Sequence, residues 1–117
     1  MKLVLILMIK NEEKILLRCL QALVGIVDIY CILDTGSTDS SVAIAKTFLE
    51  THPGCVTEEP WQNFGYNRTV SFQRAQEYCR DGGWDLKDTY GLLVDADMVF
   101  VCGSLKEKKL GAIGYKA

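Results

Sequence analysis

Runs of apolar residues alternate along this chain with segments whose apolar residues recur every three or four positions. The first run, residues 3–9, has no polar interruption, as expected of a strand covered on both faces of a sheet. The next segment carries apolar residues at helical spacing, namely Ile15, Leu16, Cys19, Leu20 and Leu23. We therefore predict a helix there, with Asn11 as its cap and Gly25 at its end.

The same alternation continues through most of the sequence. Further strands are predicted at residues 28–33, 55–58 and 90–94, and further helices at 40–50 and 68–80. Strands that alternate with helices of about 10 to 15 residues favour right-handed crossovers and a mostly parallel sheet. The predicted fold class is α/β, a Rossmann-like βαβ sandwich with a mostly parallel central sheet.

Composition limits the possible partners. The 117 residues are 49% hydrophobic, which suits one domain with its own core. The 13 basic and 15 acidic residues give a formal charge of −2, so no global positive field favours nucleic acid or an anionic bilayer. Five widely spaced cysteines without a CxxC argue against a disulfide framework and a structural zinc site. We expect a cytoplasmic protein.

The N-terminal apolar run could be mistaken for a targeting segment. No small-residue cleavage site follows it, and a polar stretch ends it at residues 10–13. The run is also far shorter than the roughly 20 residues that cross a bilayer. A buried strand without a transmembrane segment is the expected structure.

Polar clusters follow three of the predicted strands, at residues 11–13, 34–39 and 95–97. In parallel sheets, ligands bind beyond the carboxyl ends of the strands, so these clusters should meet along one rim. Asp95 and Asp97 share one side of an extended chain, and a divalent cation would offset their repulsion. A plainer interpretation is that two exposed aspartates merely end a strand.

Two loops carry weaker signals. In "DTGSTD", Gly36 allows close approach of a ligand, and Ser37 or Thr38 can cap the following helix. The alternative is an ordinary strand-to-helix turn. The aromatic residues of "PWQNFGYN", which are Trp61, Phe64 and Tyr66, could stack on a base or sugar, or could anchor the loop to the core.

Four stretches in order, "MIKNEEKILLRCLQAL", "DIYCILDTGSTDSS", "PWQNFGYNRTVSF" and "LLVDADMVF", resemble the donor-binding half of family 2 glycosyltransferases with the GT-A fold. The resemblance covers residues 3–101. It implies that the chain binds a nucleotide-diphosphate sugar, such as a UDP- or GDP-sugar. It also implies inverting transfer of the sugar to an acceptor that the sequence does not identify.

The resemblance also implies roles for single residues. "DAD" matches the DxD motif of the family, in which Asp97 would ligate Mn²⁺ or Mg²⁺ and Asp95 would face the ribose or the metal. Glu12 matches an acidic residue that holds the nucleoside, and Asp34 matches one that contacts the base. Arg68 matches a basic residue near the nucleotide.

The sequence departs from the family pattern after the DxD motif. Only residues 98–117 follow it, and Glu107 is the sole acid there, in a lysine-rich stretch that places no general base. We expect a nucleotide-sugar-binding half-domain at residues 1–103, truncated after the DxD strand, and a tail of uncertain structure at 104–117. Such a chain should be a weak or inactive transferase that self-associates through an uncovered sheet edge.

Two other functions stay open. One is a non-catalytic nucleotide-binding or assembly module. The other is an acidic-pocket domain of the phosphoacceptor type, in which Asp34 or Asp95 receives phosphate. The second fits less well, because Thr-Gly follows Asp34 and no lysine is placed after a later strand to hold a phosphoryl group.

Overall fold

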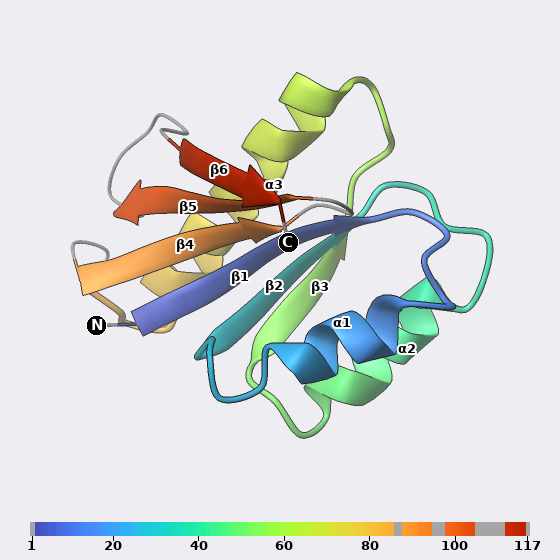
Figure 1. Ribbon diagram of the computed structural model, residues 1–117, viewed down its shortest axis with the longest axis horizontal. Helices are drawn as coiled ribbons and strands as arrows, with labels where there is room; N and C mark the ends of the chain where they lie inside the picture. Colours follow the sequence, from blue (N-terminus) through green and yellow to red (C-terminus); the bar gives the residue numbers. More distant parts are fainter. Residues whose placement is uncertain (1, 86–87, 95–97, 105–111, 117) are drawn as a thin grey trace.

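The computed structural model describes residues 2–85, 88–94, 98–104 and 112–116 (Figure 1). The chain begins with three strand–helix units, which are β1 (Lys2–Ile9), α1 (Leu16–Ala22), β2 (Ile29–Asp34), α2 (Ser41–Leu49), β3 (Gly54–Glu58) and α3 (Phe64–Asp81). Three more strands follow, which are β4 (Thr89–Val94), β5 (Met98–Ser104) and β6 (Ala112–Lys116).

Within these ranges the strands form one six-stranded sheet in the order β3-β2-β1-β4-β5-β6. β1 pairs with β2 and β4 in parallel, and β2 pairs with β3 in parallel, whereas β5 and β6 run antiparallel to their neighbours. Ile9 lies opposite Asp34, and Asp34 lies opposite Glu58. The α/β class with a mostly parallel sheet is therefore confirmed, and the carboxyl ends of β1, β2 and β3 lie at one edge.

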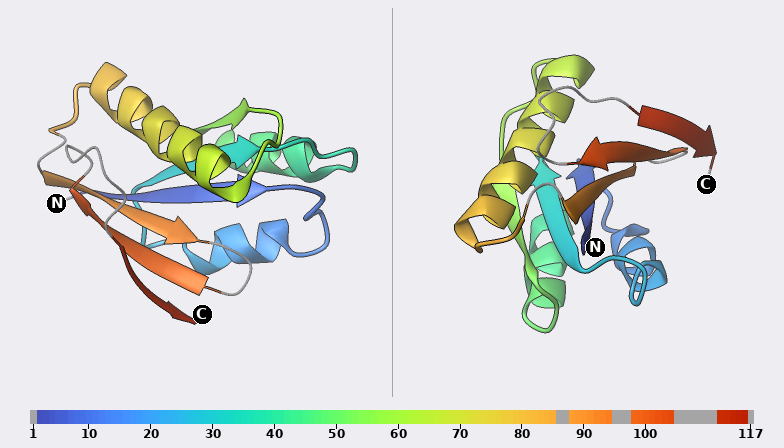
Figure 2. Two further views of the ribbon diagram at one scale, coloured as in Figure 1. Left: turned by 90° about the horizontal axis from the view of Figure 1, so that it is seen from above. Right: turned by 90° about the vertical axis from the view of Figure 1, so that its left-hand side faces the viewer.

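Helices cover both faces of the parallel part of the sheet, with α1 and α2 on one side and α3 on the other (Figure 2). Side chains of a strand alternate between its faces. Leu5 and Leu7 of β1 accordingly pack in the core on the α1 and α2 side, while Val4 and Ile6 pack in the core that includes Phe72 of α3. The continuous apolar run at the start of the sequence is thus explained by two cores.

The predicted cap of the first helix is wrong. α1 begins at Leu16, after an N-cap residue, Ile15, that makes no side-chain capping bond. Asn11 instead adopts a positive φ of 54°, and its side-chain oxygen accepts the backbone N–H of Thr38 at 2.8 Å. Asparagine tolerates this left-handed conformation, so Asn11 connects two loops rather than starting a helix.

The third helix begins four residues earlier than predicted, at Phe64. Its N-cap is Asn63, whose side-chain oxygen accepts the backbone N–H of Tyr66 at 2.8 Å. The early turns bury the polar residues Asn67 and Ser71. Because those positions are not apolar, the hydrophobic periodicity starts only later in the helix.

The last two strands lie where the sequence predicted no regular element. β5 pairs with β4, and β6, in the segment treated as a tail of uncertain structure, pairs with β5. The sheet therefore continues beyond β4, where the sequence analysis expected truncation. Among the residues described, no helix is both long enough and apolar enough to cross a membrane.

Candidate functional site

A cleft of about 450 Å³ opens at the carboxyl ends of the first three strands. Its walls come from the ends of β1, β2 and β3 and from the loops that follow, and they are formed by Lys10, Asp34, Thr35, Gly36, Ser37, Glu58, Glu59, Pro60 and Trp61. The volume is that of a small-molecule site. This is the rim at which the sequence placed its polar clusters.

Asp34 is the one buried carboxylate among the residues that line the cleft, with 4% of its surface exposed. One of its oxygens accepts the backbone N–H groups of Gly36 at 3.2 Å and Ser37 at 3.1 Å. Gly36 has a φ of 121°, a conformation that favours glycine. The turn after β2 therefore holds the carboxylate in one orientation and leaves acceptor capacity for a ligand.

Side-chain hydrogen bonds join the loop after β1 to the loop after β2. The backbone N–H of Asn11 donates to Ser37 Oγ at 2.9 Å, and the N–H of Glu12 donates to Ser41 Oγ at 2.8 Å. The N–H of Ser40 donates to the carboxylate of Glu13 at 3.0 Å. Together with the bond between Thr38 and the side chain of Asn11, these contacts tie the two loops into one unit. Ser37 and Thr38 thus do not cap α2 as predicted.

The third wall of the cleft follows β3. The backbone N–H of Glu59 donates to the carbonyl of Asp34 at 2.9 Å, which extends the sheet pairing by one residue. The Glu59 carboxylate accepts the Tyr66 hydroxyl at 2.8 Å and the Arg74 guanidinium at 3.1 Å. The bond from the hydroxyl to Glu59 raises the pKa of Tyr66. These two bonds fix Glu59 to α3, and Pro60 and Trp61 follow directly in the chain.

The structure brings only some of the predicted site residues to this cleft. Asp34 lines it, whereas Glu12 lies half-buried in the adjoining loop and its backbone bonds to α2. Arg68 lies on α3 with its guanidinium 4.3 Å from the ring centroid of Phe64, and it is not among the cleft-lining residues. Asp95 and Asp97 lie outside the described residues.

Sequence reasoning missed Lys10, Glu58 and Glu59 as cleft residues. Glu58 ends β3 directly opposite Asp34, so it follows the same rule that singled out Asp34. The signal was available, because both Lys10 and Glu58 stand at the carboxyl ends of predicted strands.

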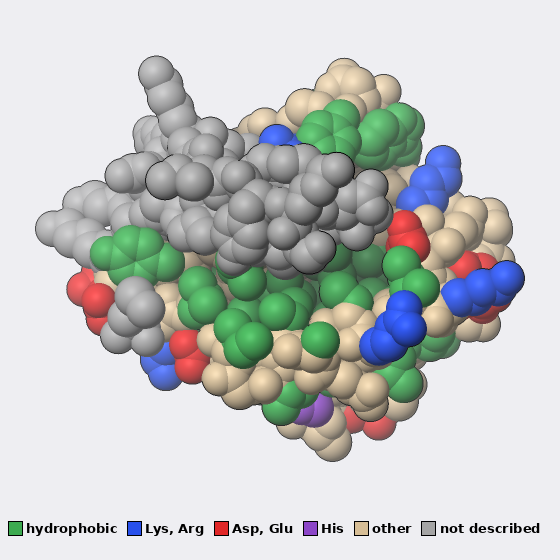
Figure 3. Space-filling model, in the orientation of Figure 1, with side chains coloured by type: hydrophobic (Ala, Val, Ile, Leu, Met, Phe, Trp, Pro, Cys, Tyr) green, Lys and Arg blue, Asp and Glu red, His purple; other side chains and the backbone are tan. Residues whose placement is uncertain are grey.

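The cleft is acidic, with three carboxylates and one lysine among its lining residues. Charged side chains of both signs lie around the end of the molecule beyond the parallel strands (Figure 3). Among the residues that the structure describes, no three His, Cys, Asp or Glu side chains are grouped closely enough to hold a metal ion.

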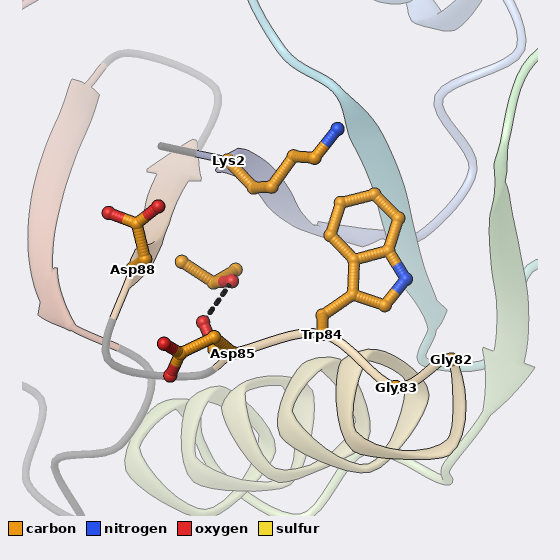
Figure 4. Close-up of a pocket in the computed structure, with 7 residues that line it drawn as sticks. Lys2, Gly82, Gly83, Trp84, Asp85 and Asp88 are labelled. Carbon is orange, nitrogen blue, oxygen red and sulfur yellow. Dashed lines mark hydrogen bonds between the residues drawn. The ribbon is translucent and has the colours of Figure 1, made fainter.

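A second pocket, of about 340 Å³, lies at the opposite end of the sheet beside the first residues of β1 and β4 (Figure 4). The ammonium group of Lys2 lies 4.7 Å from the ring centroid of Trp84, and the hydroxyl of Thr89 donates to the carbonyl of Asp85 at 2.7 Å. Lys2 thus already covers the aromatic face of Trp84. The pocket also lies away from the edge of the sheet at which α/β folds bind ligands.

Comparison with known proteins places the chain in a family. The sequence matches Glycosyl transferase family 2 over residues 4–107. Glucosyl-3-phosphoglycerate synthase from Mycobacterium tuberculosis, in complex with Mn²⁺, UDP and glucosyl-3-phosphoglycerate, is similar in structure, with a TM-score of 0.54 and 17% identity over 83% of this chain and 34% of that chain. The same enzyme with Mn²⁺, UDP-glucose and phosphoglyceric acid gives a TM-score of 0.51 and 18% identity over 83% and 33%.

The chain spans about a third of the length of these solved structures. At this level of identity the likeness concerns the fold, and it agrees with the GT-A arrangement that the sequence motifs implied. The family match extends from β1 through β5 and so includes all three loops that form the cleft. The chain belongs to glycosyl transferase family 2.

Proposed function

We propose that the cleft binds the nucleotide of a nucleotide-diphosphate sugar, with Mn²⁺ or Mg²⁺, as the donor site of a glycosyltransferase. The observation that carries the proposal is the buried, oriented carboxylate of Asp34 in a cleft of about 450 Å³ at the carboxyl edge of a family 2 sheet. The similar enzyme from Mycobacterium tuberculosis binds UDP and Mn²⁺, which supports a nucleoside diphosphate as the ligand class.

Asp34 would accept a hydrogen bond from an N–H group of the base. Two backbone N–H groups already hold its carboxylate, so binding would not require the side chain to reorient. A hydrogen bond to a charged group contributes roughly 1.5–3 kcal/mol, or about 10- to 150-fold in affinity. Glu12, in the loop bonded to the turn of Asp34, and Arg68 on α3 are proposed to contact the nucleoside more peripherally.

A divalent cation is required on electrostatic grounds. The diphosphate is anionic, and the cleft presents Asp34, Glu58 and Glu59 against only Lys10. Asp97, with Asp95, is proposed to hold Mn²⁺ or Mg²⁺, because hard cations take carboxylate oxygens and share their remaining positions with phosphates. The bound cation would neutralise the diphosphate and stabilise it as a leaving group. β4, which precedes these aspartates, runs parallel to β1 and ends with Val94 opposite Leu7, so its carboxyl end points the same way as the strand ends that form the cleft.

Sugar transfer with inversion is the proposed reaction, and UDP- or GDP-sugars are the proposed donors. Family membership favours this reaction over the phosphoacceptor alternative. The non-catalytic nucleotide-binding module remains the second candidate, because the cleft accounts for nucleotide binding and not for the transfer step. Turnover of the donor distinguishes these two functions, since both predict nucleotide binding.

Isothermal titration calorimetry with UDP and GDP tests the proposal, with Mn²⁺ and again with excess EDTA. We expect binding with Mn²⁺ and its loss with EDTA. Asp97→Asn should abolish the Mn²⁺-dependent binding of UDP, whereas Asp34→Asn should weaken uridine and UDP binding by the same factor. Asp88→Asn, which removes the same charge from the pocket at the other end of the sheet, is the matched control. Equal UDP affinity in all three variants would contradict the proposal.

A further inference from the structure

A buried side chain of α3 helps to hold the segment between β3 and α3. Asn67, in the second turn of α3, has no exposed surface. Its side-chain oxygen accepts the backbone N–H of Gln62 at 2.9 Å, and its amide nitrogen donates to the carbonyls of Pro60 at 3.2 Å and Glu59 at 3.5 Å. These bonds bracket Trp61, so the backbone on both sides of the indole is fixed to the helix.

Trp61 lines the cleft and remains 46% exposed. Its ring meets Phe64 edge to face, with centroids 6.5 Å apart and planes at 63°. Phe64 is in turn covered by the guanidinium of Arg68. The indole is therefore supported from the side of α3. A large aromatic surface that remains exposed in a preformed cleft gains free energy when a ligand covers it.

The other two aromatic residues of this region are arranged differently. Neither Phe64 nor Tyr66 is among the residues that line the cleft. The Tyr66 hydroxyl is bonded to Glu59, and the Phe64 ring packs against Trp61 and Arg68. Of the three loop aromatics that the sequence singled out, two therefore anchor the loop, and Trp61 is left to meet a ligand.

The cleft combines two kinds of surface. It has an aromatic wall at Trp61, and it has acceptor groups at Asp34 and Glu58. At Gly36, which also lines the cleft, the space that a Cβ would occupy has no atom within 4 Å. A flat heteroaromatic ring with N–H groups on its edge matches this combination, because its face can stack while its edge donates hydrogen bonds.

We propose that Trp61 is the residue on which the nucleobase of the donor stacks, and that the base lies between this indole and the turn of Asp34. The inference rests on the proposed function, because it takes the ligand to be a nucleotide. Beyond that function, the affinity for the nucleotide should depend on the base itself and on the face of one aromatic side chain. A purine or pyrimidine offers that face, so stacking alone favours neither.

The chain contains two tryptophans, which allows a direct optical test. In Trp84→Phe, Trp61 is the sole tryptophan, and the replaced residue lies in the pocket at the opposite end of the sheet. Titration of this variant with UDP and Mn²⁺ should quench its fluorescence. Inorganic pyrophosphate with Mn²⁺ carries the same charged groups without a base, and it should leave the fluorescence unchanged.

Substitution of Trp61 gives the second measurement. Trp61→Leu should weaken UDP binding by roughly 5- to 150-fold, the range found when a base loses its aromatic partner, and Trp61→Phe should lose less. The affinity for pyrophosphate with Mn²⁺ should be the same in both variants as in the parent. Equal thermal midpoints would show that folding is unaffected, as expected for a side chain that is nearly half exposed.

The outcomes separate this inference from the proposed function. Calorimetric binding of UDP without quenching, and with parental affinity in Trp61→Leu, would overturn the stacking role and leave the nucleotide site standing. An equal loss of UDP and pyrophosphate affinity would also overturn it, because the effect would not involve the base. If UDP and GDP give no calorimetric binding at all, the proposed function fails, and the stacking role fails with it.

Discussion

Removal of the Asn67 side chain should destabilise the protein strongly, although this side chain is polar. Asn67→Ala deletes an acceptor for Gln62 and a donor to Pro60 and Glu59, in a side chain with no exposed surface. Each hydrogen bond contributes about 0.5–1.5 kcal/mol, and a partner left buried without water costs about 1–3 kcal/mol. The three partners lie near the surface, so water can reach part of them. We therefore expect a loss of about 2–4 kcal/mol in the free energy of unfolding.

Urea unfolding followed by circular dichroism measures this loss. With a slope of about 2 kcal/mol per molar urea, the midpoint should fall by roughly 1–2 M. Ser71→Ala is the matched control, because Ser71 is equally buried one turn further along α3. None of the side-chain bonds described for residues 59–62 involves Ser71, so this variant should lose about 1 kcal/mol or less. Equal losses in the two variants would refute the claim that Asn67 holds the loop.

Two further predictions concern the backbone and pH. Gly54→Ala should lower the free energy of unfolding by more than about 3 kcal/mol, because the φ of Gly54 is 155° and a Cβ there would lie 1.9 Å from the carbonyl oxygen of Tyr30. Gly65→Ala in α3 is the control, because its Cβ would meet nothing closer than 3.6 Å. Its stability in urea should be unchanged or slightly higher. Hydrogen bonds from Ser41 hold the pKa of Asp39 below its usual value, so the native state should lose stability as the pH falls through and below the ordinary aspartate range. Urea titrations at pH 5, 4 and 3 should show a weaker pH dependence for Asp39→Asn than for the parent, and parallel curves for the two proteins would contradict this role.

The regular elements around the two cores were predictable because their buried positions carry apolar residues, and this local pattern is visible in the sequence. β2 is buried at all six positions, so its apolar run could be read without knowledge of its neighbours. The beginning of α3 shows no such apolar pattern, since its buried positions Asn67 and Ser71 are polar. β5 and β6 were missed because their strand character depends on pairing, of β5 with β4 and of β6 with β5, rather than on alternation within their own residues.

Some features of the candidate site were likewise predictable from the sequence, and others were not. The position of Asp34 followed from the rule that ligands bind beyond the carboxyl ends of parallel strands. The partners of its loop did not follow, because residues 26 or more apart in the sequence exchange bonds between side chains and backbone. A short polar side chain such as Asn11 can cap a helix or bridge two loops, and the sequence does not distinguish these roles.

The bonds that tie the loop after β1 to the loop after β2 have a consequence for redesign. Asn11 and Glu13 each supply both a backbone donor and a side-chain acceptor to the neighbouring loop, so each loop completes the hydrogen bonding of the other. Neither loop can be grafted alone into a related scaffold without leaving donors unmatched. Under the proposed function, nucleotide preference should therefore be exchanged between two such proteins only when both loops are transplanted together, because each loop is already ordered by the other.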